Sequence, residues 1–423
     1  MSPVSLWPRL PLSEAFWFQE GPGVRKWQFT KSGIKLLNVG NIEKNGTLNL
    51  AKTERYLDEA EVAKKYSHFL VDEGDLVIAS SGISFDDDGL LRTRGTFIKS
   101  SHLPLCLNTS TIRFKAEEGT SDLHFLRFWL NSYEFRSQIT KLVTGSAQQN
   151  FGPSHLKALK ITLPPLEKQK RIADILERAE ALRAKRRAAL AQLDELIQSI
   201  FIEMFGDPVK NPSDLKIVSL EDACSEIYRY PTFYGLEYVE EGVPIVRIGN
   251  ILSDGSLDPN KSNYVFIDPS ISKRFPRTIL ELDDILMAVR GDGSTAKRIG
   301  MVSNLNIVGA NISPNLIRIK ANRDVVNPIY LFYFLTSEYG QSVLQQSVTR
   351  TAKKTITAEN IKKVFLLHPS IKDQNKFAEI VDRVEQIKKS QQQSLLEISS
   401  LFDSLMYEAF TGKLFSPQSL SEK

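Results

Sequence analysis

The amino-acid sequence repeats itself at a nearly fixed offset, and this duplication limits the possible folds more than any other feature. The segment IKLLNVGNI at 34–42 returns as VPIVRIGNI at 243–251, 209 residues later. FLRFWLNS at 125–132 returns as YLFYFLTS at 330–337, 205 residues later. Other pairs follow in the same order, which chance does not produce. We therefore expect two similar halves, each with its own hydrophobic core.

Each half ends in a long segment with the pattern of a helix. From Leu166 to Phe205 the chain has neither glycine nor proline, and apolar residues recur with heptad spacing. At about 1.5 Å per residue, such a helix is about 60 Å long. Gly206 and Gly412 are expected to end the two helices, and Ser370 with Asp373 resembles a capping box at the start of the second.

The heptads predict how the long helices are covered. One position of the predicted seam is occupied by Ile172 and its successors at seven-residue spacing, and the companion position lies three residues later, at Ile175 and Leu182. An apolar stripe of this length has to be buried, so we expect the helices to pair as an antiparallel coiled coil with a pseudo-twofold relation between the halves. The alternative is that each helix packs on its own domain. The predicted seam residues are Ile172, Leu182, Leu193, Ile200, Phe377, Ile387, Ile398 and Leu405.

The regions before the long helices contain both strands and helices. The apolar runs DLVIAS at 75–80 and DILMAV at 284–289 are typical of buried strands. Residues 125–142 and 330–346 have the pattern of helices. The predicted class is α/β or α+β, present twice.

Composition excludes several classes of protein. Among 423 residues, 54 Lys and Arg face 50 Asp and Glu, and the net charge of +4 is only a slight indication of a polyanionic partner. The two cysteines, Cys106 and Cys224, supply neither a disulfide framework nor a thiolate zinc site. No stretch is apolar enough to cross a membrane and no signal peptide is recognisable, so a cytoplasmic protein is expected. Phosphate-loop and metal-ligand motifs were not found, and no catalytic residue is predicted.

Two similar domains on a stiff spacer suit a ligand with two sites at fixed spacing. Duplex DNA, with a turn of about 34 Å, is such a ligand. Loops after the predicted strands and polar stretches before the long helices carry side chains that bind phosphates and base edges, although each loop can equally be a solvated connection. The predicted DNA-binding residues are Ser81, Arg92, Arg94, Lys99, Gln148, Gln149, Asn150, Tyr228, Arg229, Tyr230, Arg290, Ser294, Thr295, Lys297, Arg298, Arg350, Lys353 and Lys354.

The first helix carries a recognisable motif. Pro164, Pro165, Leu166, Glu167, Gln169 and Ile172, preceded by Thr144-Gly145-Ser146, closely resemble the central conserved region of specificity (S, HsdS) subunits of type I restriction–modification systems. The second copy departs from the motif, because His368-Pro369-Ser370-Ile371 replaces the double proline.

The resemblance implies a domain plan and a role. It implies target-recognition domains at 1–160 and 208–365, conserved helices at 161–207 and 366–412, and a flexible tail at 413–423. Each domain would read half of a bipartite site on double-stranded DNA. The helices would set the gap and dock two methyltransferase subunits, with restriction subunits joining the complex. S-adenosylmethionine, ATP and Mg²⁺ would bind to the partners, so no cofactor and no metal are expected in this chain, and the assembled enzyme would methylate adenine at N6 and cleave unmodified DNA in phage defence.

Two other classes of function remain open. One is a coiled-coil scaffold without DNA readout, for which neutralising Arg290, Lys297 and Arg298 would leave the function intact. The other is a nuclease or methylase with unfamiliar motifs.

Overall fold

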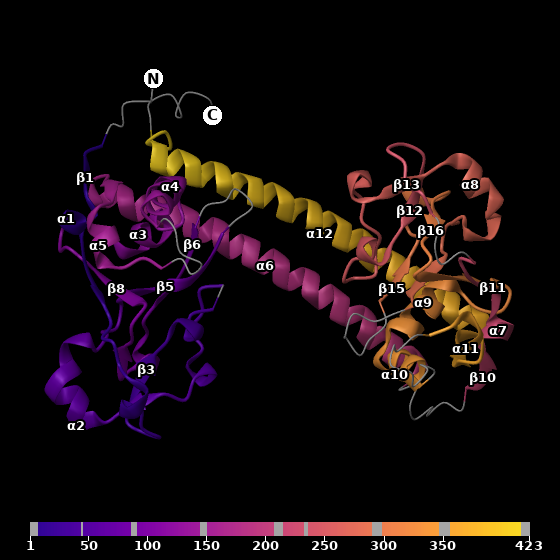
Figure 1. The fold of residues 1–423 in the computed structure, drawn as a ribbon, viewed down its shortest axis with the longest axis horizontal. Coiled ribbons are helices and arrows are strands. Elements are labelled where there is room, and N and C mark those ends of the chain that lie inside the picture. Colours follow the sequence, from indigo (N-terminus) through magenta and orange to yellow (C-terminus); the bar gives the residue numbers. More distant parts are fainter. Residues whose placement is uncertain are drawn as a thin grey trace. The chain divides into compact units, whose positions relative to one another are not determined.

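The computed structural model describes residues 7–43, 45–85, 91–143, 150–206, 215–231, 236–289, 298–346 and 356–415, with only the backbone described at 82–85 and 91–92 (Figure 1). The chain forms two compact units. The first unit comprises residues 1–186 and 394–423, and the second comprises 187–393. These units divide both long helices, and the five predicted segment boundaries stay predictions.

The long helices have the predicted bounds. Helix α6 spans Leu166–Phe205, and helix α12 spans Ile371–Thr411. Gly206 and Gly412 follow them with φ of +77° and +79°, the left-handed conformation that ends a helix. At the start of α12, the Asp373 N–H donates to Ser370 Oγ at 3.2 Å, which confirms that Ser370 caps this helix.

In the first unit, a four-stranded antiparallel sheet has the order β2-β8-β5-β6 and a three-stranded sheet has the order β4-β3-β7, in which β3 and β7 are parallel. A short antiparallel pair, β1 and β9, lies at the junction with α6. The strands are β1 (Arg9–Pro11), β2 (Phe16–Glu20), β3 (Ile34–Leu37), β4 (Tyr56–Leu57), β5 (Leu76–Phe85), β6 (Leu91–Phe97), β7 (Leu105–Leu107), β8 (Thr111–Ala116) and β9 (Lys160–Thr162), and the helices are α1 (Leu12–Ala15), α2 (Glu59–Glu61), α3 (Leu123–Trp129), α4 (Tyr133–Leu142) and α5 (Pro153–Lys157).

The second unit repeats this plan, with sheets of order β11-β17-β14-β15, β13-β12-β16 and β10-β18. The predicted class, α/β or α+β and present twice, is therefore confirmed. The strands are β10 (Lys216–Ser219), β11 (Cys224–Arg229), β12 (Val243–Val246), β13 (Val265–Ile267), β14 (Ile285–Ala288), β15 (Ile299–Met301), β16 (Asn311–Ile312), β17 (Leu316–Ala321) and β18 (Phe365–His368), and the helices are α7 (Leu220–Ala223), α8 (Pro269–Arg274), α9 (Pro328–Thr336), α10 (Glu338–Gln346) and α11 (Ala358–Lys362).

Each region predicted as one helix, at 125–142 and 330–346, is in fact two helices. The break lies at Ser132 in the first unit and at Ser337 in the second. Ser132 Oγ accepts a hydrogen bond from Phe135 N at 3.3 Å, and Ser337 Oγ accepts one from Gly340 N at 3.1 Å. A serine that satisfies a backbone N–H in this way starts a new helix, and the sequence pattern of apolar residues does not reveal it.

The ends of α6 and α12 pack together inside each unit, and there they run antiparallel. In the first unit, Ile172 and Leu176 share a core with Ala409, while the guanidinium of Arg183 lies 4.6 Å from the ring centre of Phe402. In the second unit, the rings of Phe201 and Phe377 are 5.5 Å apart. The predicted antiparallel pairing is thus confirmed within each unit, and the pseudo-twofold relation stays a prediction.

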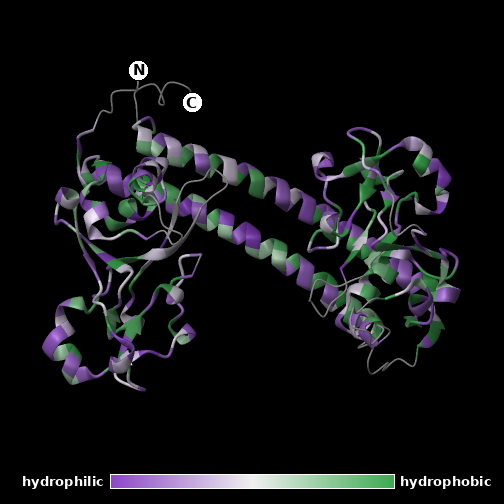
Figure 2. Ribbon diagram, in the orientation of Figure 1, coloured by the Kyte–Doolittle hydropathy of each residue, from purple (hydrophilic) through white to green (hydrophobic). Residues whose placement is uncertain are grey.

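The same helix ends also cover their own globular domains. Ile172 and Leu176 lie in one core with Phe16, Phe114 and Trp129, while Phe205 and Phe377 lie in one core with Tyr330. Hydrophobic residues accordingly gather on the strands and on the helices that pack against them (Figure 2). The two long helices therefore pair with each other and also pack on their own domains. The sequence analysis treated these two arrangements as alternatives.

The predicted seam was wrong in its companion row. Leu182 and Ile387 are 51% and 49% exposed, although both were placed in the seam. The buried companion lies four residues after the first heptad position, as at Leu176 and Val381. Since Ile175 and Leu176 are both apolar, the pattern satisfied either spacing. The other predicted seam residues are buried or partly buried: Ile172, Leu193, Ile200, Phe377, Ile398 and Leu405.

Candidate nucleic-acid interface

In each unit, several loops meet at one end of the four-stranded sheet, and this end is equivalent in the two units. In the first unit, Ser80 lies in the middle of β5, directly after the last residue that pairs with β8. Its N–H donates to Ser110 O at 2.9 Å, and its carbonyl accepts a hydrogen bond from Phe151 N at 3.0 Å. In the second unit, Val289 after β14 makes the corresponding bonds with Asn315 O at 2.9 Å and Ile356 N at 3.1 Å. We call this end the loop edge. It consists of Glu20, Ser80, Ser110 and Phe151 in the first unit and of Arg229, Val289, Asn315 and Ile356 in the second.

Several predicted DNA-binding residues lie at the loop edge. Ser81 follows Ser80 and is partly buried, whereas Asn150 precedes Phe151 and is exposed. In the second unit, Arg229 ends β11, and its Nε donates to Pro314 O at 3.2 Å. Segments far apart in the sequence, here near 81 and 150, are therefore adjacent in space, which is the arrangement that a shared binding surface needs.

Arg94 and Arg298 occupy equivalent places in the two units. Arg94 of β6 pairs with Ala79, and Ala288 N donates to Arg298 O at 2.9 Å. Each guanidinium donates to a backbone carbonyl, Arg94 to Ile42 at 3.4 Å and Arg298 to Ile248 at 3.3 Å. These bonds orient the side chains and leave Arg298 exposed. A guanidinium of this kind binds phosphate or the acceptor edge of guanine.

Tyr230 differs from the prediction, because it is buried. Its exposed fraction is 3%, its ring centre lies 4.9 Å from that of Phe275, and burial raises the pKa of its hydroxyl. It is a core residue beside the loop edge and does not present its ring to a ligand. Tyr228 is partly buried, with the guanidinium of Arg277 4.0 Å from its ring centre.

Lys99 lies at the opposite end of the sheet. It follows Ile98, whose N–H donates to Asp75 O at 2.9 Å, next to the start of β5. It is exposed but distant along β6 from the loop edge. The side chain of Arg92 is outside the description. So are the following predicted residues: Gln148, Gln149, Arg290, Ser294, Thr295, Lys297, Arg350, Lys353 and Lys354.

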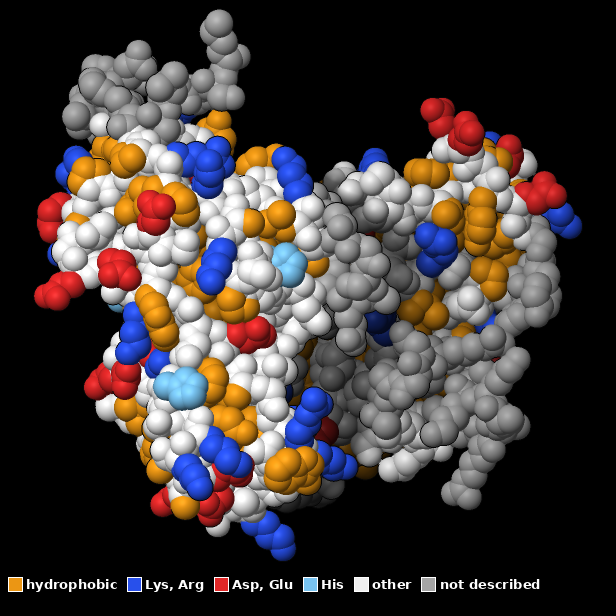
Figure 3. Space-filling view, turned by 60° about the vertical axis from the view of Figure 1, so that its left-hand side comes forward, with side chains coloured by type: hydrophobic (Ala, Val, Ile, Leu, Met, Phe, Trp, Pro, Cys, Tyr) orange, Lys and Arg blue, Asp and Glu red, His pale blue; other side chains and the backbone are white. Residues whose placement is uncertain are grey.

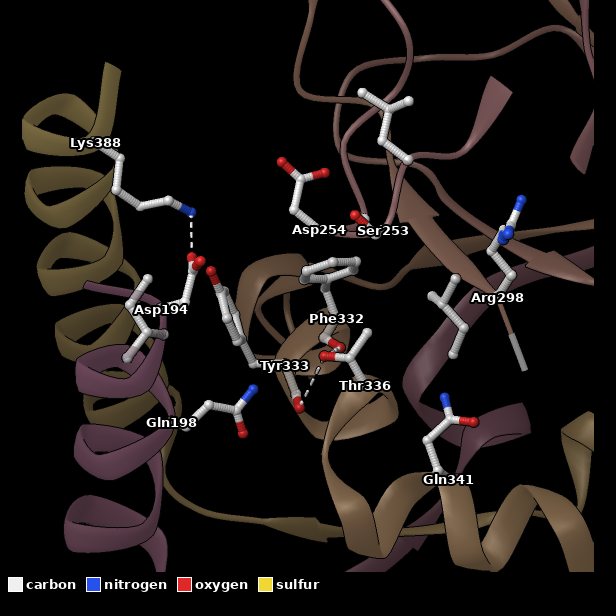
Figure 4. A pocket seen from close by; sticks show the side chains of 14 residues that line it. Asp194, Gln198, Ser253, Asp254, Arg298, Phe332, Tyr333, Thr336, Gln341 and Lys388 are labelled. Atoms are coloured by element: carbon white, nitrogen blue, oxygen red, sulfur yellow. Dashed lines mark hydrogen bonds and ion pairs between the residues drawn. The ribbon is translucent and has the colours of Figure 1, made fainter. Parts of the chain in front are cut away.

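Arg298 also borders a pocket within the second unit (Figure 4). The pocket has a volume of about 590 Å³ and is lined by α6, α9, α10, α12 and the turn at 252–255. Lys388 of α12 is buried and binds Asp194 at 2.8 Å and Glu385 at 2.7 Å. The phenol of Tyr333 lies beside this charged group, and its pKa is raised mainly by burial. The lining contains two carboxylates, Asp194 and Asp254, and two cations, Arg298 and Lys388, so the pocket favours no single ligand charge.

Charge alone does not mark the interface. On the face of the first unit that Figure 3 shows, Lys and Arg side chains are mixed with Asp and Glu. In the part of the chain that is described, no group of three or more His, Cys, Asp or Glu is placed to hold a metal ion. The loop edge is therefore distinguished by its architecture and by individual side chains.

Each four-stranded sheet contains a buried ion pair that the sequence analysis did not predict. Arg318 Nε binds Asp284 at 2.7 Å, with side chains only 3% and 1% exposed, and Arg113 binds Asp75 at 3.5 Å in the first unit. Burial raises the pKa of Asp284, although the hydrogen bond from Arg318 opposes this. Both pairs lie within the repeated segments, and a charged residue matched in both copies of an apolar strand was the available signal.

The chain thus consists of two similar domains with matching loop edges, each packed against one part of both long helices. The family model described as type I restriction modification DNA specificity domain matches residues 29–192 and 212–399. The chain therefore belongs to this family, as the motif in α6 predicted. It is a DNA-recognition component of a type I restriction–modification system, and the family acts in a complex with methyltransferase and restriction subunits.

Individual relatives agree with this assignment. The chain is 26% identical over 344 residues to the type I restriction enzyme EcoBI specificity subunit of Escherichia coli, covering 74% of this chain and 70% of that protein. It is 25% identical over 310 residues to the EcoKI specificity subunit of Escherichia coli K12, covering 69% and 65%. The specificity subunits are non-catalytic components of these systems.

Solved structures share the fold. A chain described in work on complex assembly and conformational transition of a type I system aligns with a TM-score of 0.57 at 16% identity, covering 98% of this chain and 100% of that one. The S subunit of a type I system from M. genitalium aligns with a TM-score of 0.55 at 16% identity, covering 97% of each chain. No helix in the described ranges is both long and apolar enough to cross a membrane.

Proposed function

We propose that this chain reads a bipartite DNA target, with one unit for each half-site. The observation that carries the proposal is the duplicated loop edge, in which the bonds of Ser80 are repeated by Val289. The backbone arrangement of the loop edge is the same in both units, but the side chains differ, as at Glu20 and Arg229. Equivalent frames with different side chains suit two half-sites of different sequence. DNA binding by Ser81, Arg94, Asn150, Arg229 and Arg298, and by the predicted residues outside the description, belongs to this proposal.

The paired helices set the length of the gap between the half-sites. Both α6 and α12 are continuous, and each contributes one part to each unit. A helix is stiff along its axis and has a fixed rise per residue. Helix length therefore translates into the number of base pairs that the protein spans without reading them.

The exposed apolar row on the long helices docks the methyltransferase subunits. Leu182 and Leu401 are 51% and 56% exposed in the first unit. Leu196 and Ile387 take the corresponding positions in the second unit, and apolar side chains that together form an exposed patch mark protein interfaces. Two such sites agree with two methyltransferase subunits for each specificity subunit. We place S-adenosylmethionine, ATP and Mg²⁺ in the partner subunits, and the complex in the cytoplasm.

The assembled enzyme methylates adenine at N6 and restricts unmodified DNA. Mapping N6-methyladenine in the genome of a cell that carries the chain with its partner subunits tests the proposal. The expected result is one motif of two short words separated by unread positions, absent when the chain is deleted. A continuous motif, or methylation that persists without the chain, would contradict it.

A further inference from the structure

Glu20 places a carboxylate at the loop edge of the first unit, among side chains that are otherwise neutral or cationic in the predicted DNA-binding set. It is the last residue of β2, opposite Ile112 of β8, and it is partly buried. Its Oε1 accepts a hydrogen bond from Ser110 N at 3.0 Å. Ser110 has a φ of +64°, so this bond holds a turn in a conformation that a serine rarely adopts. One carboxylate oxygen is therefore fixed by the protein.

The second oxygen, Oε2, faces the segment that precedes α5. A Cβ at Gly152 would lie 3.4 Å from it, and the exposed Asn150 is two residues away along the chain. Within the described ranges, the hydrogen bond that this carboxylate accepts comes from the Ser110 N–H and goes to Oε1. Oε2 is thus an acceptor at the surface where the loops near 81 and 150 meet.

A carboxylate on a DNA-facing surface has few favourable partners. It is repelled by phosphates, and it can only accept hydrogen bonds when ionised. In the major groove the donors are the exocyclic amino groups, N4 of cytosine and N6 of adenine. We propose that Glu20 reads one such amino group in the first half-site, a role that depends on the proposed function.

The second unit has the opposite chemistry at the equivalent position. Arg229 ends β11 opposite Ile317, as Glu20 ends β2 opposite Ile112. Its Nε is bound to Pro314 O at 3.2 Å, so each side chain is oriented by the turn that precedes the paired strand. Arginine only donates, and guanine offers the matching acceptors. At this equivalent position of the loop edge, the first unit has a hydrogen-bond acceptor, Glu20, and the second unit has a donor, Arg229.

The substitution Glu20→Gln tests this in the complete complex. Gln keeps an oxygen for the Ser110 N–H and presents an amide NH₂ where Oε2 was, so it opposes an amino group on the base. We expect discrimination at one position of the first half-site to fall by about 10- to 150-fold, the range for one hydrogen bond to a charged group. The second half-site should be unchanged. The measurements are the methylated motif in cells and competition binding with all four base pairs at each position, which also separates cytosine from adenine.

Glu14→Gln on α1 is the matched control, because Glu14 is exposed and loses the same charge. Should Glu20→Gln lower the unfolding temperature, Glu20→Asp keeps the carboxylate and should retain the base preference in weakened form. An unchanged motif would overturn the inference, and so would equal weakening on every sequence, which indicates a positioning residue. A wild-type complex without a bipartite motif would instead contradict the proposed function itself.

Discussion

The side chain of Gln169 accepts a hydrogen bond from the backbone N–H of Asp122 at 2.9 Å, and this joins the start of α6 to the N-cap residue of the domain helix α3. Gln374 repeats the contact with Asn327 N at 2.8 Å, at the start of α9. Both glutamines are fully buried, and each also donates to a proline carbonyl five residues earlier. In each unit, one buried side chain therefore ties the start of the long helix to a domain helix.

Replacing Gln169 by alanine should destabilise the first unit. The substitution leaves the Asp122 N–H and the carbonyls of Pro164 and Thr120 without their partner, and one such buried group costs about 1 to 3 kcal/mol. Chemical unfolding measures the change in free energy. Gln192→Ala, at an exposed site of α6, is the control and should change it little. Equal effects of the two substitutions would show that the buried contact adds nothing.

Replacing Arg318 by methionine should cost about 3 to 5 kcal/mol, because it leaves Asp284 buried without its cation. Arg323→Met removes the partner of Asp283 at the surface, where an ion pair contributes about 0 to 1 kcal/mol. The free energies of unfolding of the two variants give the comparison. A similar small loss for both would mean that the Arg318 pair is not effectively buried.

Replacing Leu196 by glutamate should weaken the complex with the methyltransferase subunit by at least about tenfold, because a charge then replaces an apolar contact. Ala191→Glu is the matched control, since five residues place it about 140° around the helix from Leu196. Titration of the specificity subunit with labelled methyltransferase measures the affinity. If Ala191→Glu is as harmful as Leu196→Glu, the exposed row is not the docking surface.

Replacing Arg298 by alanine should weaken recognition of the second half-site by about 1 to 3 kcal/mol while leaving the first unchanged. Arg94→Ala should do the reverse. Competition binding with oligonucleotides altered in one half-site separates the two effects. Lys99→Ala, at the far end of the sheet, should behave as the wild type. Full activity of the Arg298 variant would favour a scaffold without DNA readout.

The architecture was largely predictable because it depends on repeated patterns. The offset between the halves revealed two similar domains, and the absence of glycine and proline between Leu166 and Phe205 gave the bounds of α6. The companion row of the seam was not predictable. Adjacent apolar residues such as Ile175 and Leu176 satisfy two spacings, and packing against the domain decides which one is buried.

The candidate site was predictable in part. Loops rich in cationic and amide residues indicated Arg94, Asn150 and Arg298, but the sequence did not show that the segments near 81 and 150 meet at one end of a sheet. Tyr230 was misjudged because an aromatic residue beside an arginine fits a core as well as a surface. Glu20 was missed because acidic residues were not sought on a DNA-binding surface.

Inserting one heptad into both long helices tests the central claim most directly. The insertions belong after Arg186 in α6 and after Gln393 in α12, where the two units divide each helix. Seven residues add about 10 Å, or about three base pairs. The N6-methyladenine motif should keep both words and gain about three unread positions, whereas an insertion in α6 alone should disrupt the pairing and the activity. Two intact words at the original spacing in the doubly extended protein would contradict the account.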